Sequence, residues 1–241
     1  MLKYNLSENV TAFTTTKRYG RDKEAICEAL GVPAGRFARP HQVHGCVVRQ
    51  LTDADFSTPA LLEPYSEIME GVDAVIYDVR EACIGISTAD CIPVICYDPE
   101  HHCAAAIHAG WRGTVQRIVS KAVGEMERVY GSNPALLRCA IGPGIEMESF
   151  EVGDEVYQAF ADAQFDMTDI ARRYPARNVT DTPMKWHLDI KLCNKQQLML
   201  AGVPEENIEM CSIDTMTDER FYSARREGAA TGRILSGIVL R

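Results

Sequence analysis

Three side chains that can bind a metal or react as a nucleophile lie in short phrases rich in glycine and aspartate. The phrases are PHQVHG with His44, TADCIPV with Cys91 and HAGWRG with His108. Each phrase borders a strand-like apolar run, and functional sites are usually assembled on loops at strand ends. A thiolate and two imidazoles suit Zn²⁺, and three protein ligands leave a fourth tetrahedral position for water or substrate.

The same side chains allow two other interpretations. Cys91 could be a nucleophile with His108 as its base, as in cysteine hydrolases. Alternatively, all three could pack in the core and its loops, where free cysteines are common as small apolar residues. The residue types and their spacing leave the three alternatives open.

Composition narrows the class of protein. The chain has 241 residues, 46% of them hydrophobic, and no repeat or linker, so we expect a single domain over residues 1–241. Nine cysteines without a CxxC pair argue against a disulfide framework and against a structural zinc site. A net charge of −9 argues against binding to nucleic acid or to a membrane surface.

The chain also lacks the sequence signals of export. No apolar run approaches the roughly 18–20 residues that span a membrane. The N-terminus MLKYNLSENV does not resemble a signal peptide, so we expect a cytoplasmic protein. The sequence does not fix the oligomeric state and is compatible with a homodimer.

The elements that must position these residues are strands and helices in irregular order. Strand-like runs cover residues 73–78, 82–87, 92–98, 103–109, 137–142, 208–213 and 234–240. The gaps between the first four are too short for helical crossovers, so we expect antiparallel or mixed pairing. Apolar periodicity predicts a helix from Val115 to Val129 that Gly131 ends, and helices over 154–163 and 190–201. The predicted fold class is α+β.

Several phrases in a fixed order resemble one family. QVHG, TADCxP, HAGWRG and AIGPxI are followed by EVG, by LD…N…QL…G and by SARREG. From about Pro40 to the C-terminus the chain is similar to the YfiH/laccase-domain family. That family includes bacterial polyphenol oxidases, purine nucleoside phosphorylases and the animal laccase-domain-containing protein. The resemblance implies a four-layer αββα sandwich of mixed β-sheets and a single zinc site whose ligands map onto His44, Cys91 and His108.

The chain departs from the family pattern at three places. The cysteine that usually follows GP is Gly144 here, so a role for that cysteine does not carry over. The family phrase SYRR reads SARR, with Ala224 in place of an aromatic residue. The N-terminal TR-GG phrase reads TTTKRYG.

Residues beside the three phrases are candidates for supporting roles. His41 could line the pocket and exchange protons near neutral pH. Gln42 could hydrogen-bond a substrate. Asp90 could act with Cys91 and His108 in catalysis by orienting a ligand histidine.

An acidic protein must attract an anionic substrate through local cationic groups. Arg112 follows HAGW at a predicted helix start, where a guanidinium and free N–H groups suit phosphate. Arg225 and Arg226 form a second basic pair. Their alternative role is an ion pair with Glu219 or Glu227.

The resemblance implies zinc-dependent phosphorolysis of adenosine, inosine and methylthioadenosine, with inorganic phosphate as co-substrate and adenosine deamination as a side activity. The alternatives are a Cys–His hydrolase acting on peptidoglycan precursors and a copper-dependent polyphenol oxidase. Four coppers need many imidazoles, typically in His-x-His pairs, whereas this chain has six histidines and no such pair. A single Cu²⁺ could still occupy the zinc site, because copper binds such ligands more tightly.

Overall fold

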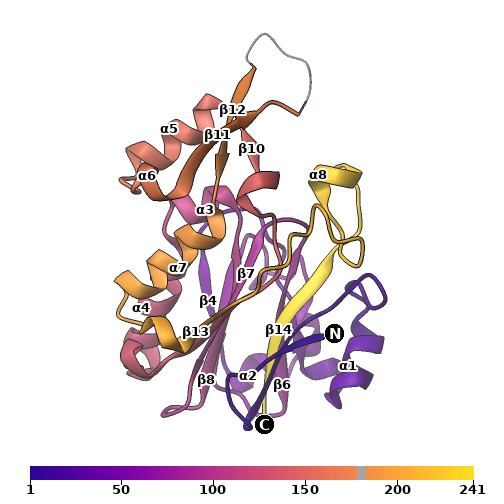
Figure 1. Cartoon of the computed structure of the whole chain (residues 1–241). Helices are drawn as coiled ribbons and strands as arrows, with labels where there is room; N and C mark the ends of the chain where they lie inside the picture. Colours follow the sequence, from indigo (N-terminus) through magenta and orange to yellow (C-terminus); the bar gives the residue numbers. More distant parts are fainter. Residues whose placement is uncertain (178–182) are drawn as a thin grey trace.

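The computed structural model describes residues 1–177 and 183–241, and two large sheets form its centre (Figure 1). The six-stranded sheet has the order β13-β9-β7-β8-β5-β4. Its strands are β4 (Val48–Leu51), β5 (Ala74–Tyr77), β7 (Ile92–Asp98), β8 (Cys103–Ala109), β9 (Arg138–Ile141) and β13 (Ile208–Met210). Strand β8 pairs antiparallel with both β5 and β7, as the short connections predict.

The five-stranded sheet has the order β1-β2-β14-β6-β3. Its strands are β1 (Leu2–Tyr4), β2 (Val10–Thr14), β3 (Phe37–Ala38), β6 (Ala82–Thr88) and β14 (Ile234–Leu240). Strand β14, at the C-terminus, pairs antiparallel with β2 and with β6 and so closes the centre of this sheet. Strands β5 and β6 are neighbours in the sequence but belong to different sheets, so the chain crosses between the sheets after Tyr77.

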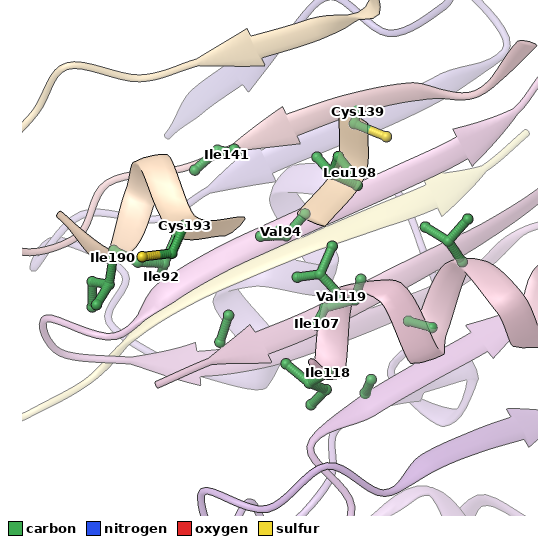
Figure 2. Close-up of a cluster of buried hydrophobic side chains, with 14 of the residues drawn as sticks. Ile92, Val94, Ile107, Ile118, Val119, Cys139, Ile141, Ile190, Cys193 and Leu198 are labelled. Carbon is green, nitrogen blue, oxygen red and sulfur yellow. The ribbon is translucent and has the colours of Figure 1, made fainter. Parts of the chain in front are cut away.

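Helices cover the outer faces of both sheets. Helices α4 (Ile118–Tyr130) and α7 (Ile190–Leu200) pack on the six-stranded sheet, and α1 (Lys23–Leu30) packs on the five-stranded sheet. Figure 2 shows Val119 and Leu198 of these helices near Val94 and Ile107 of the sheet. The described residues therefore form four layers in the order αββα.

Side chains alternate between the layers because successive residues of a strand point to opposite faces. In β5, Ala74 and Ile76 belong to the cluster under the helices, whereas Val75 and Tyr77 belong to the cluster between the sheets. All four are fully buried. A sheet covered on both faces explains why these strands read as continuous apolar runs.

The predicted α+β class and the αββα sandwich are confirmed. Gly131 ends α4 with φ of 73°, and its N–H reaches the carbonyl oxygens of Met126 and Glu127. The predicted start at Val115 is displaced, because Arg117 has φ of 62° and separates α4 from the short α3 (Trp111–Val115). The phrase HAGWRG therefore joins the end of β8 to a short helix of its own, α3.

A third, small sheet stands at one end of the sandwich, at the top of Figure 1. It consists of β10 (Glu151–Val152), β12 (Met184–Leu188) and β11 (Ala171–Pro175), beside α5 (Asp154–Asp162) and α6 (Met167–Ile170). The remaining helices are α2 (Asp53–Phe56) and α8 (Ala224–Glu227), and 3₁₀ turns cover Ala34–Arg36, Pro59–Leu62, Pro134–Leu136, Met147–Ser149 and Glu205–Asn207. Among the described residues, no helix combines the length and apolar character needed to cross a membrane.

Candidate metal centre

The three predicted ligands meet where β6 ends, β7 begins and β8 ends. One ligand atom from each of His44, Cys91 and His108 lies within 4.8 Å of the other two. Cys91 immediately precedes β7, and the β7–β8 register sets Ile92 opposite Ala109 and so brings Cys91 beside the end of β8. His44 arrives from the loop before β4. Sheet pairing thus gathers ligands that are far apart in the sequence.

Gly110 leaves the space in which the ligands meet. A Cβ atom at this position would lie 3.1 Å from both Cys91 Sγ and His44 Cδ2. That separation is tighter than ordinary van der Waals contact, so any larger residue would push the two ligands aside. The site therefore requires glycine at position 110 for steric reasons.

Asp73, the residue immediately before β5, holds two of the ligands with one carboxylate. Its Oδ1 accepts a hydrogen bond from His108 Nδ1 at 2.7 Å and another from the His44 N–H at 3.0 Å. Its Oδ2 accepts from the N–H groups of Val43 and Gly45 at 3.3 and 2.7 Å. The carboxylate is fully buried. It fixes the tautomer that leaves His108 Nε2 free to bind a metal, and it supports the positive φ of 62° at His44.

Electrostatics at the site favour the charged forms of Cys91 and His108. Burial raises the pKa of the Cys91 thiol, but the charge of His108 and contacts with both imidazoles outweigh it and bring the pKa to about 6. Burial lowers the pKa of His108, but the Cys91 thiolate and Asp73 raise it to about 9. Burial also raises the pKa of Asp73, yet the His108 hydrogen bond and charge hold it below its ordinary value.

This donor set fits a zinc ion. A thiolate and two imidazoles are the ligands that Zn²⁺ prefers. The Cys91 thiolate binds directly, whereas the His108 imidazolium must lose its Nε2 proton when the metal binds. A buried carboxylate behind a ligand histidine is the usual outer-shell arrangement at such sites.

The cluster opens into a cavity of about 760 Å³, which is the size range of small-molecule sites. Its walls combine imidazole, aromatic and guanidinium groups. They consist of Arg21, Arg39, Pro40, His41, Gln42, His44, Pro64, Tyr65, Ser87, Thr88, Ala89, Asp90, Cys91, His108, Ile145, Phe150, Ala224, Arg225, Ala229 and Arg233.

The match to known proteins extends over nearly the whole chain. The family model described as multi-copper polyphenol oxidoreductase laccase matches residues 4–241. The chain belongs to this family. The resemblance to the YfiH/laccase-domain family is thereby confirmed. A solved YfiH structure from Bacillus licheniformis has a TM-score of 0.85 and 27% identity, over 96% of this chain and 93% of that one. The YlmD structure from Geobacillus stearothermophilus also has a TM-score of 0.85, at 26% identity over 99% and 94% of the two chains.

Two relatives carry names that state an activity. A protein of Bacteroides thetaiotaomicron named purine nucleoside phosphorylase is 38% identical over 91% of this chain and 79% of its own length. A protein from an unknown prokaryotic organism named adenosine deaminase RL5 is 38% identical over 87% of this chain and 77% of its own length.

His41 and Gln42 both line the cavity of this laccase-family chain, and both have protein partners. His41 Nδ1 donates to Glu70 Oε1 at 2.8 Å, and its ring centroid lies 4.1 Å from that of Tyr65. The Gln42 amide bonds to both main-chain groups of Ser87, at 2.7 and 2.9 Å. Gln42 thus ties the QVHG loop to strand β6, which is a positioning role.

Asp90 has a different place from the one expected. Its carboxylate accepts hydrogen bonds from Thr215 Oγ1 and from the Arg225 N–H, both at 2.7 Å. The carboxylate that bonds to His108 Nδ1 belongs to Asp73. Asp90 instead joins the cysteine-bearing turn, where its own φ is 84°, to the C-terminal loop.

The three candidate arginines separate in the structure. Arg112 is exposed and lies outside the cavity lining, with its guanidinium carbon 4.2 Å from the Trp111 ring centroid. Arg226 also lies outside the lining and bonds to Glu227 at 2.6 Å, as its alternative role predicted. Arg225 lines the cavity and donates to the carbonyl oxygens of Ser149 and Glu151.

The fold also brings to the site residues that no sequence pattern indicated. Asp73 and Gly110 act on the ligands directly, while Arg21, Arg39 and Arg233 supply positive charge to the cavity. Tyr65 and Phe150 add aromatic surface. Tyr65 has φ of 70°, an unusual conformation for a bulky residue, and the sequence gives no sign of it.

Proposed function

We propose that this chain is a zinc-dependent purine nucleoside phosphorylase that accepts adenosine, inosine and methylthioadenosine and deaminates adenosine as a side activity. The observation that carries the proposal is one cavity that combines a His–Cys–His cluster with guanidinium groups. The names of the two relatives at 38% identity support it.

The reaction makes two demands on the protein. Phosphorolysis breaks the bond between the ribose anomeric carbon and the purine nitrogen and forms a bond from that carbon to a phosphate oxygen. The cavity must therefore hold a nucleoside and an anion side by side, for which about 760 Å³ is adequate. Tyr65, Phe150 and His41 offer aromatic surface to a purine base.

The His–Cys–His cluster would add a metal ion to this cavity. When bound, zinc acts as a Lewis acid and lowers the pKa of water, which suits deamination. His44, Cys91 and His108 would hold it, and Asp73 would keep the His108 ring in the binding orientation. Copper is an alternative occupant of the same three ligands. The described residues contain a single such cluster, which offers little support for a multicopper oxidase.

A hydrolase is the second candidate, and one observation favours it. Cys91, His108 and Asp73 have the order of a nucleophile, its base and an orienting carboxylate. The pKa of about 6 would keep Cys91 as a thiolate at neutral pH. Such an enzyme could act on peptidoglycan precursors.

His44 distinguishes the two candidates, because it is a metal ligand in the first, whereas in the second it only helps His108 to stabilise the Cys91 thiolate. The test measures zinc by elemental analysis and base release from adenosine with and without phosphate, in the wild type and in His44→Ala. We expect one zinc per wild-type chain and phosphate-dependent base release, both lost in the variant. Base release that persists in a metal-free variant, or that ignores phosphate, would contradict the proposal.

A further inference from the structure

Two of the four arginines that line the cavity have no protein partner among the described residues. Arg225 and Arg233 each donate to main-chain carbonyl oxygens of the loops around them. Arg21 and Arg39 line the same cavity, and within residues 1–177 and 183–241 neither guanidinium has a hydrogen bond or an ion pair. Their charge is therefore available to a ligand.

Arg39 is held in place by its main chain. Arg39 directly follows β3, and its N–H donates to the Leu62 carbonyl oxygen at 3.1 Å. The next residue is Pro40, whose ring fixes its own φ. The side chain is half-buried. A half-buried guanidinium without a partner is costly, which indicates that an anion from outside completes the site.

The surroundings of Arg39 leave its charge uncompensated. Burial and the neighbouring charge of Arg21 lower the pKa of the Arg39 guanidinium. Glu63 is the acidic group nearby, but its carboxylate forms an ion pair with Lys23. Within the described part of the chain, two guanidiniums without a partner thus concentrate positive charge at the cavity of a protein whose net charge is −9.

We propose that Arg21 and Arg39 form the phosphate subsite of this enzyme and bind the inorganic phosphate co-substrate. This inference rests on the proposed function. A guanidinium presents two parallel N–H donors to phosphate oxygens, and two of them match the charge of a dianion. The role expected of Arg112 passes to them because Arg112 lies outside the cavity.

The subsite and the metal cluster line the same cavity. Arg39 precedes His44 by five residues, and five residues span at most about 18 Å when fully extended. Both residues line the same cavity. A phosphate on Arg39 and a nucleoside near His44 therefore share one space.

The experiment uses the zinc-loaded full chain and inorganic phosphate as the probe. Calorimetry gives the phosphate Kd without nucleoside, and steady-state assays give the KM of phosphate and of adenosine. Arg39→Gln and Arg21→Gln are compared with Arg49→Gln, which removes an exposed arginine of β4 outside the cavity. Arg39→Lys keeps the positive charge but loses the two parallel N–H donors of the guanidinium. Melting curves confirm that each variant is folded.

We expect Arg39→Gln to raise the Kd and KM of phosphate about tenfold or more while the KM of adenosine changes little. Arg39→Lys should fall between the wild type and Arg39→Gln, and Arg49→Gln should match the wild type. Phosphate constants that are equal in Arg39→Gln, Arg21→Gln and Arg49→Gln would overturn the subsite.

Two further outcomes separate related hypotheses. If phosphate binds in an Arg39-dependent manner but no base is released, the subsite stands and the phosphorylase proposal fails. Adenosine 5′-monophosphate, assayed in parallel, tests whether the arginines hold a phosphate that belongs to the nucleotide. Arg39-dependent turnover of that nucleotide, with phosphate constants unchanged, would overturn the assignment to inorganic phosphate.

Discussion

Asp73 Oδ1 lies 2.7 Å from His108 Nδ1, and the same buried carboxylate accepts the main-chain N–H groups of residues 43–45. The start of β5 therefore controls the ring of one ligand and the loop that carries another. Through this one side chain, the register between β5 and β8 sets the geometry of the metal centre.

Asp73→Asn should weaken zinc binding by about 10- to 100-fold, because the outer partner of His108 changes from a carboxylate to an amide. Its amide NH₂ would also face main-chain donors, so we expect about 1–3 kcal/mol of lost stability. Competition with a chromophoric chelator measures the affinity, and urea unfolding measures the stability.

The matched control is Asp78→Asn, which changes an exposed carboxylate just after the other end of β5. It should leave both measurements near the wild type. Wild-type zinc affinity in Asp73→Asn would show that the carboxylate does not organise the ligands.

Gly110→Ala should displace the ligands, because its Cβ would lie 3.1 Å from both Cys91 Sγ and His44 Cδ2. We expect weaker zinc binding with the fold retained. Gly124→Ala is the control, since nothing lies within 4 Å of a Cβ there and the position is inside α4. That change should instead stabilise the protein by up to about 1 kcal/mol. Equal zinc affinity in the two variants would contradict the steric argument.

Removal of the metal should leave the chain folded. Three apolar clusters fill the layers of the described residues, and they do not depend on an ion as a small zinc finger does. Free zinc at a thousandfold its Kd contributes about 4 kcal/mol, which corresponds to roughly 8–16 °C in Tm for a chain of this size. Calorimetric melts with and without chelator measure the difference. An unfolded apo-protein would mean that the site is structural.

The features that could be predicted from the sequence are those that a local residue pattern determines, namely the strands and the ligands at their ends. The apolar runs at 92–98 and 103–109 form strands β7 and β8, as predicted. Cys91 and His108 were identified because they lie at the ends of those runs. Asp73 was not identified, because its partners come from sheet register and from a distant loop. Arg112 was expected at the start of the long helix, but it lies in the separate short α3, and its side chain stacks on Trp111 outside the cavity lining. Arg39 lies at the site because β3 pairs with β6, and no local sequence pattern predicts that pairing.

The reactivity of Cys91 gives a final prediction, for the metal-free protein. Its pKa of about 6 lies below that of a free thiol, about 8.5, so the thiolate is populated above pH 6 and lost as the pH falls below it. The rate of iodoacetamide labelling at Cys91, followed by peptide mass spectrometry, should therefore rise with a midpoint near pH 6. In His108→Gln the imidazolium is absent, and the midpoint should move to higher pH. Bound zinc should suppress labelling in the wild type. A midpoint near that of a free thiol in both proteins would show that His108 does not stabilise the thiolate.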